Sequence, residues 1–166
     1  TGELKVEKSL TTPNDLTQGV ENSLRLAQVD PNSIEFFVHG GTTVINAITE
    51  RKGAKTALVT TAGFRDVLEI ARGNRPDLYN LSFEKPTPFV PRRLRFEVRE
   101  RLNAVGQEVE SLELADLDAV VERCRAEKVE AVAVQLLHSY AAPKHEAICA
   151  QYLRDKLPGI AVTASY

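Results

Sequence analysis

The sequence predicts an α/β fold with two lobes, residues 1–84 and a smaller lobe over residues 85–166. Short apolar runs rich in β-branched residues alternate with segments of helical periodicity, and the connections between them are short. This order favours parallel strands joined by right-handed crossovers. Residues 72–93 hold four of the eight prolines and little periodicity, which predicts an ordered loop or an excursion from the sheet between the lobes.

The first lobe is predicted to open with a half-buried strand over residues 3–10, where polar and apolar residues alternate. The segment Thr12-Pro13-Asn14-Asp15 then predicts a helix start, with a hydroxyl cap, a proline in the first turn and an acidic residue near the positive end of the dipole. Residues 30–33 indicate a turn, and Ile34–Val38 has the composition of a buried strand.

The remaining elements follow from the same patterns. The apolar stripe Leu117, Val120, Val121 and Cys124 marks a helix at i, i+3, i+4 and i+7. The others are, in order, a helix ending near residue 53, a strand over 56–60, a helix over about 65–71, a strand with alternating Leu94, Phe96 and Val98, a turn at 104–106, a strand over 129–137, a helix from Pro143 to Pro158-Gly159, and a strand starting over 160–163.

Composition places the chain among ordinary globular proteins. At 166 residues, with 43% hydrophobic and 27% charged residues, it belongs to none of the collagen-like, mucin-like or mostly disordered classes. A net charge of −2 gives no global field that would recruit nucleic acid or an anionic membrane. No apolar run approaches the roughly 18–20 residues of a membrane span, and no signal segment opens the sequence.

Both cysteines, Cys124 and Cys149, fall in predicted helices and are expected to be buried structural thiols. Two cysteines do not make a disulfide framework, which favours a reducing, cytoplasmic location. No paired-cysteine zinc spacing is present, and no metal site is predicted. The sequence starts at Thr1 without any methionine, so we expect a processed product, a trimmed chain or part of something longer.

Three polar segments follow predicted strands, and ligands of open α/β sheets bind beyond the carboxyl ends of strands. The first is His39-Gly40-Gly41-Thr42-Thr43, with Asn46 one turn further on. Paired glycines let the backbone approach a ligand closely, and amides at a helix start favour an anionic or strongly polar group. The alternative is a strand-to-helix turn capped by threonine, with His39 hydrogen-bonded in place.

The second segment, Thr60-Thr61-Ala62-Gly63-Phe64-Arg65-Asp66, also lies between a strand and a helix, and it offers Thr60, Thr61, Arg65 and Asp66 as candidates. The alternative interpretation of this segment is a turn that caps the following helix, with the Phe64 side chain packed beneath the turn.

The third segment holds Arg72, Asn74 and Arg75. Two guanidinium groups around a Gly-Asn turn suit a carboxylate, bicarbonate or phosphate, because arginine binds oxyanions with two parallel hydrogen bonds. Alternatively, the two arginines tie this loop to Asp66, Glu69 or Asp77.

Three other features carry weaker signals. His138 closes the strand over 129–137 and is a candidate site residue, with a structural histidine as the alternative, whereas His145 at a helix start is expected on the surface. The arginines over 92–101 are interrupted by two glutamates, which favours a strand edge with salt bridges or a subunit contact over nucleic-acid binding. No Gly-x-x-x-x-Gly-Lys-[Ser/Thr] loop and no Gly-x-Ser-x-Gly elbow is present.

The string from Phe37 to Leu58, FVHGGTTVINAITERKGAKTAL, resembles the N-terminal domain of the hydantoinase A/5-oxoprolinase family. The likeness continues through four further segments and so covers nearly the whole chain. These segments are Thr60–Asp66, Arg72–Leu81, Pro91–Arg95 and Leu136–Ala141. Two details, Gly40–Ala47 and Ile70–Asp77, lean toward the acetone carboxylase and acetophenone carboxylase branch.

The resemblance implies part of a ribonuclease H-like fold of the actin, Hsp70 and sugar kinase type, with ATP and Mg²⁺ bound between two lobes. It also implies that ATP phosphorylates a carbonyl or enolate oxygen of a small substrate, before a lactam or hydantoin ring is hydrolysed or a ketone is carboxylated. On this interpretation the groups of Gly40 to Thr43 hold the substrate or the transferred phosphoryl. Arg72 and Arg75 then steady an oxyanion, and His39 positions a proton.

The sequence departs from the family pattern because no Asp-x-Gly-Gly-Thr-x-Thr-Asp phosphate loop and no second nucleotide-binding lobe are present. We therefore expect the isolated chain to bind ATP poorly and to be inactive by itself, with the missing parts supplied by the same polypeptide or by partners in a hetero-oligomer. Two other functions stay open, a non-catalytic interaction module acting through residues 85–101 and an independent small-molecule or anion-binding domain. The enzymatic hypothesis requires the segment starting at His39 and the turn after Thr60 to converge.

Overall fold

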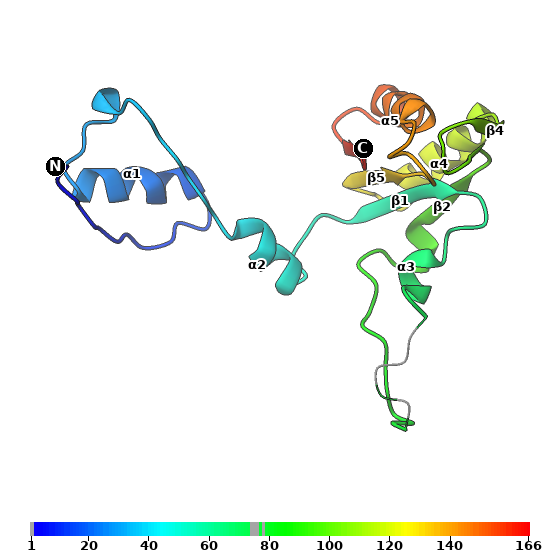
Figure 1. Ribbon diagram of the computed structural model, residues 1–166, viewed down its shortest axis with the longest axis horizontal. Helices are drawn as coiled ribbons and strands as arrows, with labels where there is room; N and C mark the ends of the chain where they lie inside the picture. Colours follow the sequence, from blue (N-terminus) through cyan, green and yellow to red (C-terminus); the bar gives the residue numbers. More distant parts are fainter. Residues whose placement is uncertain (1, 74–76, 78) are drawn as a thin grey trace. The chain divides into compact units, whose positions relative to one another are not determined.

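The computed structural model describes residues 2–73, 77 and 79–166 and divides into two compact units, Thr1–Thr43 and Val44–Tyr166 (Figure 1). The predicted boundary between residues 84 and 85 falls inside the second unit. The reason lies in the sheet, because β2 (Arg95–Val98), which follows that boundary, pairs with β1 (Thr56–Thr61), which precedes it.

The first unit contains helix α1 (Leu16–Leu26) and a 3-10 turn at Pro31–Ser33, both as predicted. The cap of α1 is Asp15 rather than Thr12, because the Asp15 carboxylate accepts a hydrogen bond from the Thr17 N–H at 3.0 Å. A carboxylate at this position satisfies an amide that has no partner within the helix.

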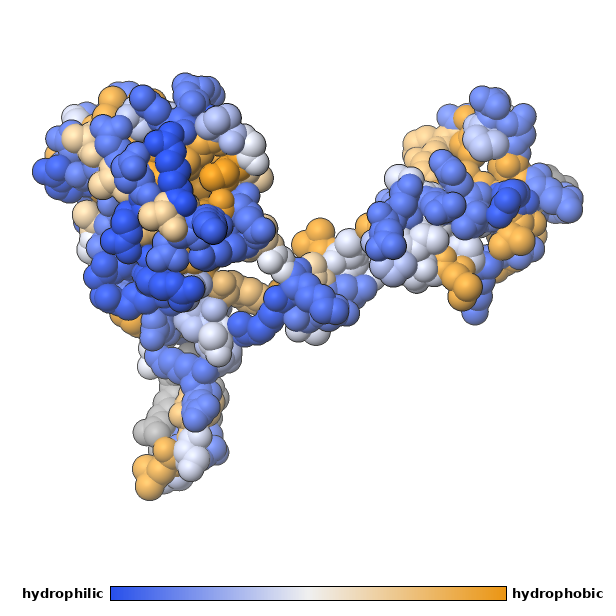
Figure 2. Space-filling model, turned by 180° about the vertical axis from the view of Figure 1, so that it is seen from behind, coloured by the Kyte–Doolittle hydropathy of each residue, from blue (hydrophilic) through white to orange (hydrophobic). Residues whose placement is uncertain are grey.

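The strands predicted over residues 3–10 and 34–38 are wrong, since neither segment forms a strand. Leu4, Leu10 and Phe36 have exposed fractions of 86%, 88% and 85%. An apolar alternation becomes a strand only where another strand takes up its backbone hydrogen bonds, and the described residues of this unit supply none. The space-filling view accordingly shows apolar side chains on the surface of the unit that contains α1 (Figure 2).

The second unit is built on a four-stranded parallel sheet in the order β2-β1-β5-β6, where β5 is Ala131–Gln135 and β6 is Ala161–Ala164. A strand was predicted at each of these four places, and all four pair in parallel. In β1 the residues alternate between the two faces, so Ala57 and Val59 enter the core and Leu58 and Thr60 point the other way. The sheet thus separates the core from a second face, which carries both apolar and polar side chains.

The helices of this unit are α2 (Thr43–Thr49), α3 (Val67–Ile70), α4 (Leu114–Ala126) and α5 (Lys144–Lys156), all within predicted segments. Helices α4 and α5 pack against each other and against the sheet, and the predicted stripe of α4 is buried. No helix of the described residues has the length and apolar character to cross a membrane.

Both cysteines are buried, as expected, and neither forms a disulfide. Burial raises the pKa of the Cys124 thiol to about 11 and that of the Cys149 thiol to about 12. The two thiols are therefore protonated at neutral pH and act as small apolar side chains of α4 and α5.

A short hairpin, β3 (Arg101–Leu102) and β4 (Glu108–Glu110), surrounds the predicted turn at 104–106. Its strands are too short to give a sequence pattern. Gly106 at the tip has a φ of +79°, and a Cβ there would lie 3.0 Å from the Ala141 carbonyl oxygen. Glycine is required here both by the backbone conformation and by the close approach of the loop after β5.

Candidate functional site

A pocket of about 660 Å³ lies at the carboxyl ends of β1 and β5, on the sheet face opposite the core. We call it the strand-end pocket. Its polar lining includes Thr60 from β1, His138, Ser139 and Tyr140 from the loop after β5, and Ser165 from the segment after β6. This is the place where open parallel sheets bind ligands, because loops from several strands meet there.

The pocket offers hydroxyl groups and an imidazole ring for hydrogen bonding. Nδ1 of His138 lies 2.9 Å from the Tyr140 hydroxyl, with the two rings edge to face, and the hydroxyls of Ser139 and Ser165 are 3.2 Å apart. Phe64 and other apolar side chains complete the wall, and the described lining holds no Asp, Glu, Lys or Arg. These groups suit an uncharged polar ligand with an apolar part.

His138 adopts a left-handed backbone conformation with a φ of +62°. This conformation costs roughly 1–2 kcal/mol in a residue with a Cβ. The Ala141 N–H donates a hydrogen bond of 2.9 Å to the His138 carbonyl and closes the turn. Strain of this kind persists only where the surrounding structure imposes it, and it concentrates at functional sites.

A buried carboxylate holds two walls of the pocket together. Glu146 of α5 is 1% exposed, and it accepts hydrogen bonds of 2.9 Å from the Leu136 N–H, the Ser165 N–H and the Ser165 hydroxyl, and one of 3.1 Å from the Tyr166 N–H. Four donors of the chain itself therefore satisfy the two carboxyl oxygens of Glu146. Because Leu136 follows β5 and Ser165 follows β6, Glu146 fixes one loop against the other.

A second buried carboxylate, Glu100, lies behind β1. It accepts a hydrogen bond from the Thr61 hydroxyl, which itself accepts one of 2.9 Å from the Leu137 N–H. Nδ1 of His145 lies 2.9 Å from the other oxygen of Glu100. Thr61 is therefore occupied behind the pocket rather than in it.

The expectation of a surface His145 is wrong, because this side chain is 2% exposed. Its Nε2 lies 2.9 Å from Glu108 of the β3–β4 hairpin, which covers the start of α5. Hydrogen bonds from Ser111 first, and then from His145 and Lys144, lower the pKa of Glu108 to about 2. The β3–β4 hairpin, which the sequence pattern did not reveal, thus buries His145. From its position at the start of a helix alone, this histidine was expected in solvent.

The predicted site residues fall into several places. The structure brings Thr60 and His138 together in the strand-end pocket, with Thr61 directly behind it. Asp66 lies outside that lining and binds Arg92 through two hydrogen bonds of 2.9 and 3.0 Å, which lower the pKa of its carboxyl. Arg65 lines a different pocket beside β2.

The glycine-rich segment His39-Gly40-Gly41-Thr42-Thr43 is exposed at the end of the first unit, and Asn46 is exposed in α2. The His39 ring stacks on Phe37 at a centroid distance of 6.4 Å. Its convergence with the turn after Thr60 stays a prediction. Arg72 is exposed, whereas Asn74 and Arg75 lie outside the described residues.

Sequence reasoning missed Tyr140, Ser165 and Glu146. Tyr140 and Ser165 each follow a predicted strand, so the rule that selected Thr60 and His138 could have found them. Glu146 left no such signal, because a charged residue in the first turn of a helix is usually solvated and its backbone partners come from distant loops.

Residues 1–157 match the family described as the hydantoinase/oxoprolinase N-terminal region. The chain belongs to this family. The resemblance carried by the glycine-rich segment and by the loop after β5 is thereby confirmed.

Two relatives match almost the whole chain. An uncharacterized protein of Methanocaldococcus jannaschii is 35% identical over 99% of this chain and 25% of its own length. The caprolactamase subunit alpha of Pseudomonas jessenii is 30% identical over 99% of this chain and 25% of its own length. The chain therefore spans about a quarter of the length of these relatives.

The fold also matches a solved structure. The nucleotide-free structure of acetone carboxylase, an enzyme of ATP-dependent acetone carboxylation, superposes with a TM-score of 0.82 at 24% identity. The match covers 97% of this chain and 26% of that one. It confirms the mixed α/β fold with a parallel sheet.

Proposed function

We propose that the chain supplies the substrate side of an active site in which ATP phosphorylates a carbonyl or enolate oxygen. Ring hydrolysis or carboxylation of the activated substrate follows. Family membership supports the reaction class, together with the caprolactamase name and the ATP-dependent acetone carboxylation of the similar structure. The strand-end pocket is the observation that carries the proposal.

The pocket suits the uncharged substrate better than the nucleotide. A triphosphate requires cationic groups, and the described lining offers none. A ketone, lactam or hydantoin requires a hydrogen-bond donor for its carbonyl oxygen and an apolar wall for its carbons, which Thr60, His138 and Phe64 supply. Since Nδ1 of His138 is engaged by Tyr140, its Nε2 is the ring nitrogen left to bind the substrate in this proposal.

The glycine-rich segment takes the transferred phosphoryl in this proposal. Neither Gly40 nor Gly41 has a positive φ, and a Cβ on Gly40 would meet nothing within 4 Å, so the chain's own packing does not require glycine there. Glycine at these positions would still allow a ligand to approach the backbone closely. The amides of Gly40 and Gly41 and the hydroxyls of Thr42 and Thr43 hold the oxygens, His39 positions a proton, and Arg72 and Arg75 balance the charge.

The described residues do not by themselves fit Mg²⁺. The described part of the chain contains no group of three His, Cys, Asp or Glu side chains that could hold a metal ion. Near the pocket, Glu100 and Glu146 are already bound by donors of the chain itself. ATP, when bound, supplies the phosphoryl group, and the ligands of its metal come from outside the described residues.

The proposal includes the rest of the active site. We propose that the other parts of the same polypeptide, or partner subunits of a hetero-oligomer, complete a ribonuclease H-like nucleotide site around this chain. Two facts support this arrangement. The chain spans only a quarter of the length of its caprolactamase relative, and that relative is named as a subunit.

The interaction-module hypothesis gains no specific support. Three of the arginines through which such a module would act are engaged within the chain, with Arg92 bound to Asp66, Arg95 to Glu69 and Arg99 to Asp116.

The test is a substrate-dependent ATPase assay of the protein with the segments or subunits that accompany this chain. Hydantoin, 5-oxoproline, caprolactam, acetone and acetophenone are each added, and ADP release is measured. At least one should stimulate ATP consumption. The variants Thr60→Val and His138→Asn should raise the KM for that compound by about tenfold, the effect of one lost hydrogen bond, while the KM for ATP stays unchanged.

The two variants are matched to the structure. Valine keeps the shape of Thr60 without its hydroxyl, and asparagine tolerates the left-handed backbone of His138 without its imidazole. Thr56→Val, at the far end of β1 and outside the pocket, is the control. The proposal fails if no compound stimulates ATP consumption, or if both pocket variants match this control.

A further inference from the structure

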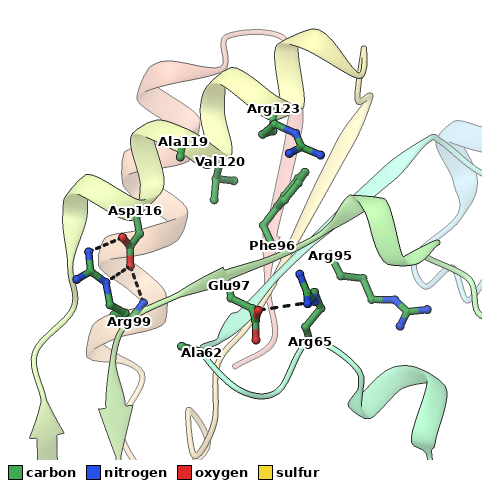
Figure 3. A pocket seen from close by; sticks show the side chains of 10 residues that line it. All are labelled: Ala62, Arg65, Arg95, Phe96, Glu97, Arg99, Asp116, Ala119, Val120 and Arg123. Atoms are coloured by element: carbon green, nitrogen blue, oxygen red, sulfur yellow. Dashed lines mark hydrogen bonds and ion pairs between the residues drawn. The ribbon is translucent and has the colours of Figure 1, made fainter.

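A second pocket, of about 360 Å³, lies between β2, α4 and the turn after β1 (Figure 3). We call it the arginine pocket, because Arg65, Arg99 and Arg123 line it. Phe96 and Val120 supply an apolar wall. Among the described residues it shares no lining residue with the strand-end pocket, so what it binds is a separate matter from the proposed function.

The two carboxylates that line the arginine pocket already have hydrogen-bond partners within the chain. Asp116 binds Arg99 through hydrogen bonds of 2.9 and 2.7 Å and also accepts one from the Arg99 backbone N–H. One oxygen of Glu97 accepts a hydrogen bond of 2.7 Å from the Gly63 N–H. Its other oxygen is 3.7 Å from Nε of Arg65, a distance that allows attraction but no hydrogen bond.

Two of the arginines keep unused donors. Nε of Arg65 is buried and is the sole buried side-chain nitrogen or oxygen in the described part of the chain without a hydrogen-bond partner. Arg123 lies over the Phe96 ring, 5.8 Å from its centroid, and its guanidinium has no hydrogen bond or ion pair among the described residues. A buried donor without a partner is costly, and a bound ion or ligand is one explanation for it.

The charges of the pocket do not cancel. Three guanidinium groups, of Arg65, Arg99 and Arg123, stand against the carboxylates of Glu97 and Asp116, which leaves one positive charge. Arg95 also lines the pocket, but its guanidinium is engaged elsewhere, 3.0 Å from Glu69. Figure 3 shows the Arg95 side chain directed away from Phe96 and Arg123.

We propose that the arginine pocket binds a small organic oxyanion, a carboxylate or a phosphate ester. Guanidinium groups bind both headgroups with two parallel hydrogen bonds, and the donors of Arg65 and Arg123 are available for them. The apolar body of the ligand packs on Phe96 and Val120. The bound anion neutralises the remaining charge and gives the buried Nε of Arg65 a partner.

The experiment measures binding to the whole protein by calorimetry, with benzoate and phenyl phosphate as probes. Benzamide serves as the neutral control of nearly the same shape as benzoate. At least one anion should bind saturably, about tenfold or more tightly than benzamide, and more weakly as salt is added. The tighter of the two anions identifies the headgroup.

Variants locate the binding. Arg123→Gln and Arg65→Gln should each weaken the anion about tenfold or more, consistent with the loss of a charge-assisted hydrogen bond. Arg125→Gln is the matched control, because Arg125 is on the same helix but outside the pocket and paired with Glu122. If Arg123→Gln does not fold, Arg123→Lys keeps the charge and should still weaken binding, since lysine lacks the planar fork.

Three results would overturn the proposal. They are equal affinity for benzoate, phenyl phosphate and benzamide, no saturable binding of either anion, and Arg65 and Arg123 variants that bind like Arg125→Gln.

Discussion

The two units of the chain carry similar apolar patterns and use them differently. In Val44–Tyr166 the apolar runs become strands of one sheet, and Ala57, Val59 and Val134 are at most 1% exposed. In Thr1–Thr43 the alternating run that contains Leu10 stays outside any sheet. The difference teaches that periodicity selects a face but does not supply the neighbour that buries it. A strand needs both.

The largest contrast concerns core packing. Leu153→Ala in α5 removes a side chain that is 0% exposed and should lower the free energy of unfolding of the second unit by about 2–5 kcal/mol. Urea denaturation followed by thiol labelling measures it, because Cys124 and Cys149 both lie in this unit and react only once exposed. A loss below 1 kcal/mol would mean that α5 is not part of the core.

A smaller effect is expected where the second unit buries a hydrogen-bonded carboxyl group. Glu146→Gln replaces a carboxylate oxygen that accepts hydrogen bonds with an amide group that donates, so at least one N–H from the loops after β5 and β6 loses its partner. We expect a loss of about 1–3 kcal/mol in the free energy of unfolding, measured in urea. Glu84→Gln makes the same substitution at an exposed position and is the control, and equal stability of the two variants would contradict the buried network.

Acid should act on the second unit through Glu108. The pKa of Glu108 is about 2 in the folded protein, against 4.5 for an unperturbed glutamate side chain. Its contribution to stability is therefore present above pH 4.5 and is lost as the pH falls toward 2. The urea midpoint of the wild type should fall over this range more steeply than that of Glu108→Gln. Parallel curves for the two proteins would contradict the role of Ser111, His145 and Lys144 in holding this carboxylate.

The smallest effect is expected in the first unit. Leu10→Ser should change the free energy of unfolding by no more than about 0.5 kcal/mol, because this side chain is 88% exposed. Differential scanning calorimetry of the protein measures it. A loss comparable to that of Leu153→Ala would mean that another segment or subunit buries Leu10, and the contrast between the units would then disappear.

Much of the second unit could be predicted because its signals are local. The alternation in β1 and the stripe from Leu117 to Cys124 in α4 are visible within a few residues. Thr60 and His138 could be placed in the site because one lies at and the other just beyond the carboxyl end of two strands that pair in parallel. Glu100 and Glu146 could not be, because their partners are backbone groups and side chains brought close only by the sheet and by a hairpin of two-residue and three-residue strands.

Gly106 has a consequence for the loop that carries His138. The absence of a side chain lets the hairpin tip approach Ala141, three residues beyond His138 in sequence. Any larger residue would displace this turn, and with it both His138 and Tyr140, relative to Thr60 of β1. The position of the His138 loop at the strand-end pocket thus depends on a residue without a side chain in the neighbouring hairpin.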